Sequence, residues 1–129
     1  MIAGIGIDII EVERIQKELS ESEDAFCNKI FTKNEITYCR KASSKQVQSQ
    51  RYAARFAAKE AFFKAVGTGL RDGLQWKDVE MCHDDLGKPH LELKNKALDL
   101  IKKEKISNIL LSISHSKNNA VAVVILEKE

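Results

Sequence analysis

A few side chains in this sequence are of types that do chemistry and stand in unusual surroundings. Asp8 is a carboxylate in an isoleucine-rich stretch, and His115 ends an apolar run between two serines. Glu60 and Lys64 lie four positions apart in an alanine-rich segment. Each also has an ordinary structural explanation: a cap for the following helix, a surface ion pair, or a hydrogen-bonded residue at a strand end. Taken singly, none of them identifies an activity.

Taken together, Asp8, Glu60 and Lys64 predict a site for magnesium and phosphate. Mg²⁺ prefers hard oxygen ligands and is usually held by one or two carboxylates and a substrate phosphate. Asp8 and Glu60 would supply the carboxylates if the first strand packs beside the helix, and Lys64 would neutralise a phosphate on the same ion. The loop with Gly67 and Gly69 would complete a pyrophosphate site. These are the components of phosphoryl-type transfer, and the residues alone indicate no more than that.

The distribution of charge also indicates an anionic partner. The 129 residues include 21 Lys+Arg and 19 Asp+Glu, so the formal net charge is only +2. Residues 1–24 carry a net charge of −5, whereas residues 25–71 carry +8. A basic middle third of this kind suits phosphate, nucleic acid or an acidic protein, although solvated helix faces would give the same count.

The composition excludes several classes of protein. Hydrophobic residues make up 43% of the chain and charged residues 31%, which is too apolar for a disordered chain and suits one domain over residues 1–129. The longest apolar run, 120–126, is too short to cross a bilayer, and no signal-peptide pattern precedes Gly4. The three cysteines show no metal-ligand spacing, so we expect reduced thiols in a cytoplasmic protein.

The elements before residue 51 can be predicted from periodicity and capping signals. Residues 4–9 alternate isoleucine with glycine or aspartate, which predicts a strand whose glycine face allows close approach by a backbone or a ligand. An amphipathic helix follows and should end in the polar stretch 20–24. Thr32 and Glu35 form a capping-box pattern for a further helix, and residues 41–50 suggest a loop or an irregular helical entry.

Residues 51–66 give the clearest helix prediction, because alanine dominates and has the highest helix propensity. A helical wheel places small and apolar side chains on one face, suited to packing on a sheet: Ala54, Ala57, Ala58, Ala61, Phe62 and Ala65. The opposite face mixes aromatic and charged side chains: Phe56, Lys59, Glu60, Phe63 and Lys64. A glycine-rich exit follows this helix.

The last third of the chain is predicted as two hairpins around one helix. The first hairpin joins residues 79–83 to 90–93, and the second joins 109–115 to 120–127. Asn95 is expected to cap the intervening helix. Since strands and helices mix without strict βαβ alternation, the predicted class is α+β.

Two segments resemble the signature motifs of the holo-[acyl-carrier-protein] synthases, the short type of 4′-phosphopantetheinyl transferase. Residues 4–15 (GIGIDIIEVERI) match the N-terminal motif. Residues 55–65 (RFAAKEAFFKA) match the second motif, a W/F-x-x-K-E-A-x-x-K pattern. Residues 87–89 and 112–116 match further family segments in the family's order, so the resemblance covers nearly the whole chain.

The resemblance implies an α+β fold in which helices pack on a small antiparallel sheet. It also implies an enzyme of fatty acid biosynthesis. Such an enzyme moves 4′-phosphopantetheine from coenzyme A to a serine of apo acyl carrier protein and releases adenosine 3′,5′-bisphosphate. Family members are typically homotrimers with active sites between subunits, and they bind neither membranes nor nucleic acid.

Site residues follow from the same resemblance, position by position. Asp8 and Glu60 match the family's Mg²⁺ ligands, and Lys64 matches the lysine that contacts the pyrophosphate. Glu60 and Lys64 are therefore the expected catalytic residues, with either Glu60 or a metal-activated water as the base for the serine. The expected coenzyme A-binding residues are Lys59, Lys64, Gly67, Gly69 and His115.

One departure and two alternative functions remain open at this stage. The family usually presents bases just after the first helix to bind an acidic carrier, whereas residues 18–24 here are strongly acidic. The carrier would then dock mainly on bases between residues 29 and 55, or be less acidic itself. A non-catalytic nucleic-acid or carrier-binding module would use the basic 25–71 segment, although no RNA-reading aromatic pattern accompanies it. A phosphohydrolase would use the same metal pair.

Overall fold

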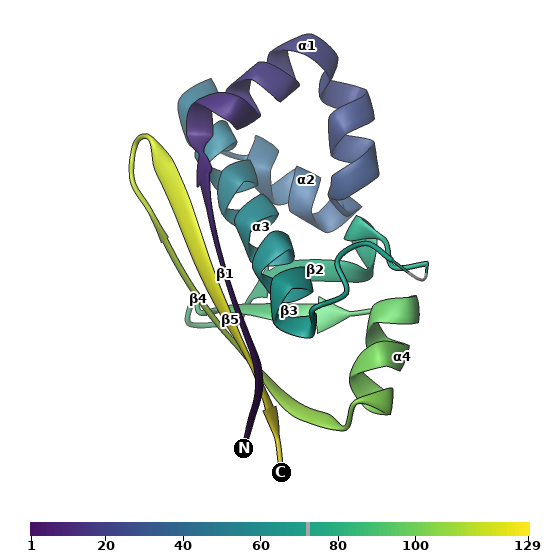
Figure 1. The fold of residues 1–129 in the computed structure, drawn as a ribbon. Coiled ribbons are helices and arrows are strands. Elements are labelled where there is room, and N and C mark those ends of the chain that lie inside the picture. Colours follow the sequence, from purple (N-terminus) through teal and green to yellow (C-terminus); the bar gives the residue numbers. More distant parts are fainter. Residues whose placement is uncertain (72) are drawn as a thin grey trace.

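The computed structural model describes residues 1–71 and 73–129 and contains a three-stranded antiparallel sheet with the order β1–β5–β4 (Figure 1). Strand β1 is Ile2–Glu11, and β4 (Ile106–His115) and β5 (Asn119–Lys128) form the C-terminal hairpin that was predicted. Because β5 lies in the centre, the first strand of the chain pairs with the last. Asp8 of β1 therefore lies opposite Ala122 of β5.

Helix α1 spans Val12–Ile30, and the end that was predicted within residues 20–24 corresponds to a break between two helical segments. The helix breaks at Ser22, where φ is −157° and ψ is 59°, and then resumes. Cys27 and Ile30 in the second half are buried in the core. Burial of these two apolar side chains explains why the chain becomes helical again after the polar stretch.

Helix α2 (Lys33–Arg40) begins at the predicted capping box. The Thr32 hydroxyl accepts a hydrogen bond from the backbone N–H of Glu35 at 3.2 Å, and the Glu35 carboxylate accepts one from the backbone N–H of Thr32 at 2.9 Å. Helix α3 spans Lys45–Val66, so most of residues 41–50, predicted as a loop or an irregular helical entry, belong to a regular helix. Ser44 caps α3 by accepting from the backbone N–H of Val47, a signal that the polar sequence had concealed.

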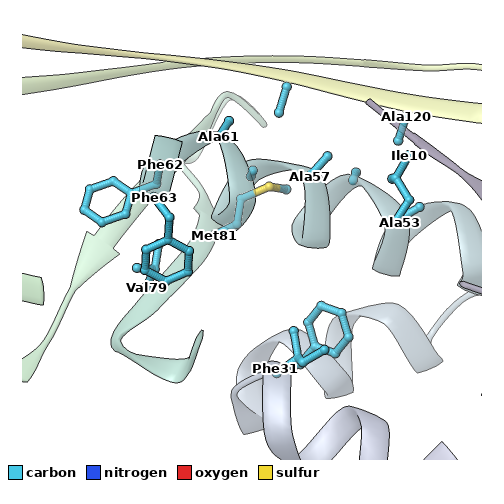
Figure 2. Close-up of a cluster of buried hydrophobic side chains, with 14 of the residues drawn as sticks. Ile10, Phe31, Ala53, Ala57, Ala61, Phe62, Phe63, Val79, Met81 and Ala120 are labelled. Carbon is cyan, nitrogen blue, oxygen red and sulfur yellow. The ribbon is translucent and has the colours of Figure 1, made fainter. Parts of the chain in front are cut away.

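The small face of α3 packs on β1 and β5, as predicted. Figure 2 shows Ala57 and Ala61 pointing toward the strands, and both are fully buried. Gly4 and Gly6 lie on the inner face of β1, which packs against the helix. A Cβ atom on Gly6 would overlap the carbonyl oxygen of Ala61. The close approach expected at the glycine face is thus an approach by the backbone of α3.

The side chains that the helical wheel groups on the opposite face of α3 lie in two different environments. Lys59 and Phe63 are buried, since α1, α2 and the 3₁₀ turn η1 (Trp76–Asp78) cover that side of the helix. Phe63 makes an edge-to-face contact with Trp76, with 5.6 Å between ring centroids. Glu60 and Lys64 lie on the remaining flank, toward β1.

A separate two-stranded hairpin, β2 (Val79–His83) with β3 (Pro89–Leu93), packs below α3, and α4 (Asn95–Lys103) follows it (Figure 1). The predicted cap at Asn95 is wrong, because Lys94 is the N-cap and Asn95 has a left-handed φ of 51°. Its side-chain amide donates to Asp78 at 3.1 Å instead. The helices and antiparallel strands confirm the α+β class. Within the two described ranges, no helix is long and apolar enough to cross a membrane.

The outer face of the three-stranded sheet is apolar and uncovered. Ile5, Ile7 and Ile9 of β1 point away from α3 and are 59% to 68% exposed. Neighbouring side chains on this face come from β5 and β4: Val121, Val123, Ile125 and Leu110. A contiguous apolar face of this kind on a single chain typically marks a surface for another protein.

Candidate active site

Asp8, Glu60 and Lys64 meet where β1 packs against α3. Asp8 shares the inner face of β1 with Gly6, so its side chain points toward the helix. The Lys64 ammonium donates to Oδ1 of Asp8 at 3.0 Å and to the backbone carbonyl of Ile7 at 3.1 Å. Glu60 lies one helical turn before Lys64 on the same flank. The structure therefore brings together the three residues from which the sequence predicted a metal and phosphate site.

The positive charges around Glu60 do not fully compensate the burial and repulsion that its carboxylate experiences. Burial raises the pKa of Glu60, and the negative charge of Asp8 raises it further. The positive charges of Lys64 and Arg14 act in the opposite direction but do not cancel the rise. Two hard oxygen donors close enough to repel each other suit a divalent cation, which would relieve that repulsion.

Arg14 belongs to this site, and the sequence reasoning missed it. It comes from the first turns of α1, and it also lines a groove of about 980 Å³ beside the end of β1. Lys17 and Ser20 line the same groove. Arg14 lies within the matched motif at residues 4–15, but only the fold brings it to the charge of Glu60.

Lys59 does not reach this site, although Glu60 is the next residue. Successive helical side chains differ by about 100°, and Lys59 points to the other side of α3, where its side chain is 0% exposed. Its ammonium donates to the Glu35 carboxylate at 2.7 Å and to the carbonyls of Ile30 at 2.8 Å and Trp76 at 3.2 Å. Its placement thus gives no support to the expected contact between Lys59 and coenzyme A.

The partner of Lys59 is itself held by three elements. Glu35 closes the capping box of α2, accepts the Lys59 ammonium from α3 and accepts the backbone N–H of Met81 in β2 at 3.0 Å. Thr32 also donates from its hydroxyl to the buried carboxylate of Glu80. This network fixes α3 against α2 and the β2–β3 hairpin.

A second pocket, of about 370 Å³, lies between the N-terminal half of α3, α2, the β2–β3 hairpin and the end of β4. His115, one of the predicted site residues, lines it together with Arg51, Arg55 and His83. Both guanidinium groups stack on the ring of Tyr38, at 4.5 and 4.3 Å from its centroid. The net charge of +8 over residues 25–71 was the only sequence signal for these arginines.

Arg55 gives the clearest indication of the kind of ligand that this pocket could bind. Its side chain is almost fully buried, and its Nε has no hydrogen-bond partner within the described part of the chain. Burial, and then the positive charge of Arg55, lower the pKa of His83. A bound anion would compensate both effects.

The two charged sites lie on opposite flanks of α3. Asp8 aligns with Ala122 in the central strand and, through it, with Ile113 in β4, which lines the second pocket. Helix α3 covers β1 and β5 between them.

The predicted glycines end α3 rather than contact either charged site. Gly67 has a φ of 87° and its backbone N–H donates to the carbonyl of Phe63 at 2.9 Å, which closes the helix. Gly69 has a φ of 61°, and a Cβ atom would meet nothing within 4 Å at either glycine. The loop is open, and the requirement for these glycines comes from the backbone conformation.

Comparison with known proteins adds independent information. Residues 4–124 match the family model of the 4′-phosphopantetheinyl transferase superfamily. The holo-[acyl-carrier-protein] synthase of Geobacter sp. (strain M21) is 50% identical over 128 residues, which is 99% of this chain and 100% of that protein.

Solved structures show the same similarity. The holo-(acyl-carrier-protein) synthase of Bacillus anthracis, in complex with CoA (3′,5′-ADP), aligns with a TM-score of 0.81 and 43% identity, covering 100% of this chain and 99% of that one. The Helicobacter pylori synthase in complex with coenzyme A aligns with a TM-score of 0.82 and 29% identity, covering 95% and 99%.

Proposed function

Because the chain belongs to the 4′-phosphopantetheinyl transferase superfamily, we infer that it transfers 4′-phosphopantetheine from coenzyme A to a serine of apo acyl carrier protein. Adenosine 3′,5′-bisphosphate is the second product. The observation that carries this function is the meeting of Asp8, Glu60 and Lys64, because it joins the two matched motifs into one site. We further propose that the reaction serves fatty acid biosynthesis in the cytoplasm, where the free thiols would stay reduced.

We propose Mg²⁺ as the metal, with Asp8 and Glu60 as its protein ligands. Both side chains are hard oxygen donors, and a divalent cation would offset the burial and the repulsion from Asp8 that raise the pKa of Glu60. When bound, the ion would neutralise pyrophosphate charge and polarise the phosphoryl group under attack. The soft donors Cys27 and Cys39 are buried away from this site, which leaves it selective for a hard cation.

Lys64 is proposed to stabilise the leaving group. The serine oxygen forms a bond to the β-phosphorus of coenzyme A, and the bond from that phosphorus to the bridging oxygen breaks, leaving its electron pair on the adenosine 5′-phosphate. The Lys64 side chain is 53% exposed and anchored only at its tip, so its ammonium can turn from Asp8 to that phosphate. The serine proton passes to Glu60 or to water, and electrostatic stabilisation supplies most of the rate enhancement.

The second pocket is proposed to hold another phosphate of the coenzyme. Arg51 and Arg55 offer guanidinium donors, and His115 lies at its rim on β4. The unpartnered Nε of Arg55 supports an anionic ligand here. Gly67 and Gly69 remain predicted coenzyme contacts in an open loop, whereas for Lys59 we propose a positioning role through Glu35.

We propose a homotrimer with active sites between subunits; the number of subunits follows from the family resemblance, and two observations support a site shared between subunits. The carboxylate site and the arginine pocket lie on opposite flanks of α3, so one coenzyme molecule could use the carboxylates of one subunit and the pocket of another. The apolar outer face with Ile5, Ile7 and Ile9 offers a surface for subunit contact. Burial of this face would also remove an aggregation hazard.

The carrier protein is proposed to approach along the groove beside α1. Arg14 and Lys17 line this groove next to the carboxylate site and could pair with acids of a carrier, although Glu11 and Glu13 line the groove too. The acids of α1 that depart from the family pattern, Glu18, Glu21, Glu23 and Asp24, do not line it. Docking is therefore expected to use the first two turns of α1 and the exposed bases beyond residue 29.

A mass-shift assay tests this function directly. Purified protein, Mg²⁺ and coenzyme A should raise the mass of a cognate apo acyl carrier protein by one phosphopantetheine group, and chelation of Mg²⁺ should stop the reaction. A binding module would leave the carrier mass unchanged and bind with a steep salt dependence. A phosphohydrolase would consume coenzyme A without any carrier, and either of these results would contradict the transferase.

A further inference from the structure

The β2–β3 hairpin carries three metal-ligating side chains that the transfer reaction does not use. Cys82 of β2 lies directly opposite His90 of β3, and Glu92 follows His90 on the same face of the strand. One ligand atom from each residue lies within 4.8 Å of the other two. They include a thiol, an imidazole and a carboxylate, so this cluster is more than a group of surface acids.

We infer that Cys82, His90 and Glu92 form a binding site for Zn²⁺ or a similar borderline divalent ion. Zinc takes Cys sulfur, His nitrogen and carboxylate oxygen in tetrahedral geometry, with bond lengths that place neighbouring ligand atoms about 3.3–3.7 Å apart. Nε2 of His90 already lies 3.4 Å from the Glu92 carboxylate. The remaining separations close by rotation of side chains that are at least partly exposed.

The donor set separates this site from the one at Asp8 and Glu60. A thiolate and an imidazole select zinc-like ions, whereas magnesium takes hard oxygen ligands and keeps its waters. Three protein ligands leave one tetrahedral position to a solvent molecule. The chain would therefore hold two cations of different chemical preference at two separate places.

The surroundings of Cys82 determine how the metal would bind. Its thiol donates to Oε1 of the buried Glu80 at 3.4 Å, and burial together with the charges of Glu80 and Glu92 raises the pKa of Cys82 to about 12. The thiol is therefore protonated at neutral pH when no metal is bound. Zinc would displace that proton, and the thiolate charge would be compensated by the ion.

Binding would stiffen the hairpin that forms one wall of the arginine pocket. A two-stranded hairpin is only marginally stable by itself, and a metal that joins Cys82 to His90 would tie its strands together. Met81, His83 and Pro89 of the same hairpin line that pocket. The metal would thus stabilise a wall of the second site without touching it.

Titration with Co²⁺ and Zn²⁺ tests the site in the full-length protein under reducing conditions. Co²⁺ should give tetrahedral d–d bands and a thiolate-to-cobalt charge-transfer band, which excess Zn²⁺ should remove. Cys82→Ser should abolish the charge-transfer band, and His90→Ala should weaken Zn²⁺ binding at least about tenfold. His83→Ala takes an imidazole from the other face of the same hairpin and should leave the affinity unchanged.

A second measurement does not depend on the absorption bands of cobalt. Cys82 is the only one of the three cysteines that is not fully buried, so thiol alkylation of the native protein should report on it alone, and Zn²⁺ should slow that alkylation. The inference is overturned if Co²⁺ gives no thiolate band in the folded wild-type protein. It is equally overturned if Cys82→Ser and His90→Ala bind Zn²⁺ as tightly as the wild type does.

Discussion

The ammonium of Lys64 lies 3.0 Å from Oδ1 of Asp8, although 56 positions of sequence separate the two residues. A lysine on the second motif therefore neutralises a proposed metal ligand on the first. The pair is partly exposed, with 53% of the Lys64 side chain accessible, so its contribution to stability is small. This relationship allows the charge of Lys64 to be removed without unfolding the protein.

Lys64→Met should lower kcat at least about 100-fold, because the charge on the leaving phosphate would lose its cation. The free energy of unfolding should change by no more than about 1 kcal/mol. Single-turnover transfer and urea denaturation measure the two quantities. Lys103→Met, an exposed lysine at the end of α4, is the matched control and should keep normal kcat. Near-normal turnover of Lys64→Met would contradict the proposed role.

Glu60→Gln should make the metal-free protein more stable at high pH than the wild type. Because the pKa of Glu60 is raised by burial and by Asp8, the folded chain keeps this proton to a higher pH than the unfolded chain. Stability of the wild type therefore falls as the pH rises from the ordinary glutamate pKa to the raised one, and the cost persists above it. Glutamine has no such titration.

Urea denaturation of both proteins in chelator, at about pH 4 and about pH 8, measures the difference. The gain in Glu60→Gln should appear only at the higher pH, and added Mg²⁺ should stabilise the wild type but not the variant. Glu18→Gln, an exposed carboxylate on α1, should behave as the wild type at both pH values. Equal stability of Glu60→Gln and wild type at the higher pH would argue against a raised pKa of Glu60.

Lys59→Met should destabilise the protein by about 3–5 kcal/mol, since it leaves the buried carboxylate of Glu35 without its cation. Adding Glu35→Gln to it should recover part of the loss, because the uncompensated charge is then gone. Equilibrium denaturation measures both effects. Lys77→Met, an exposed lysine in η1, should change stability by less than about 0.5 kcal/mol. A loss that small in Lys59→Met would show that the ion pair is not buried.

Gly6→Ala should destabilise the protein by about 1–3 kcal/mol, because its methyl group would overlap the carbonyl oxygen of Ala61 and push α3 away from β1. Transfer activity at a temperature where the variant is folded should also fall, since Glu60 and Lys64 move with the helix. Ala3→Ser on the exposed edge of the same strand is the control. Unchanged activity and stability would exclude the close packing described.

Ile7→Glu should break the proposed trimer by placing charge at the centre of the apolar face. Light scattering should then give the mass of one chain with native secondary structure, and transfer should be lost if sites form between subunits. Leu86→Glu, in the β2–β3 turn, alters an even more exposed apolar residue away from that face and should leave the assembly intact. A trimer that survives Ile7→Glu would locate the interface elsewhere.

The sequence alone was sufficient to place a residue where the periodicity of a single strand or helix determines its position. Alternation along β1 correctly placed Asp8 on the face that meets α3, and the spacing of Glu60 and Lys64 correctly put them on one flank. The capping box at Thr32 was likewise confirmed, because its two hydrogen bonds depend on a few consecutive residues. These are the parts of the candidate site that need no knowledge of the rest of the fold.

The predictions were incomplete or wrong where contacts between residues distant in the sequence determine the structure. A helical wheel cannot tell that Lys59 is covered by α1 and η1, so the sequence grouped it with Glu60. The helix resumes after the break at Ser22 because Cys27 and Ile30 further on are buried. Nothing local relates Arg55 to His115, which share a pocket only after the second hairpin packs beside α3.

The buried contact between Lys59 and Glu35 has a mechanical consequence for catalysis. Lys59 and Glu60 project from one rigid helix, so the contact on one flank determines how far α3 can roll about its axis on the other. Since side-chain tips lie about 5–6 Å from a helix axis, a roll of about 10° would shift the Glu60 carboxylate by about 1 Å. A displacement of that size can cost about a hundredfold in rate. The buried Lys59 would thus limit rotation of the helix that carries the proposed catalytic groups.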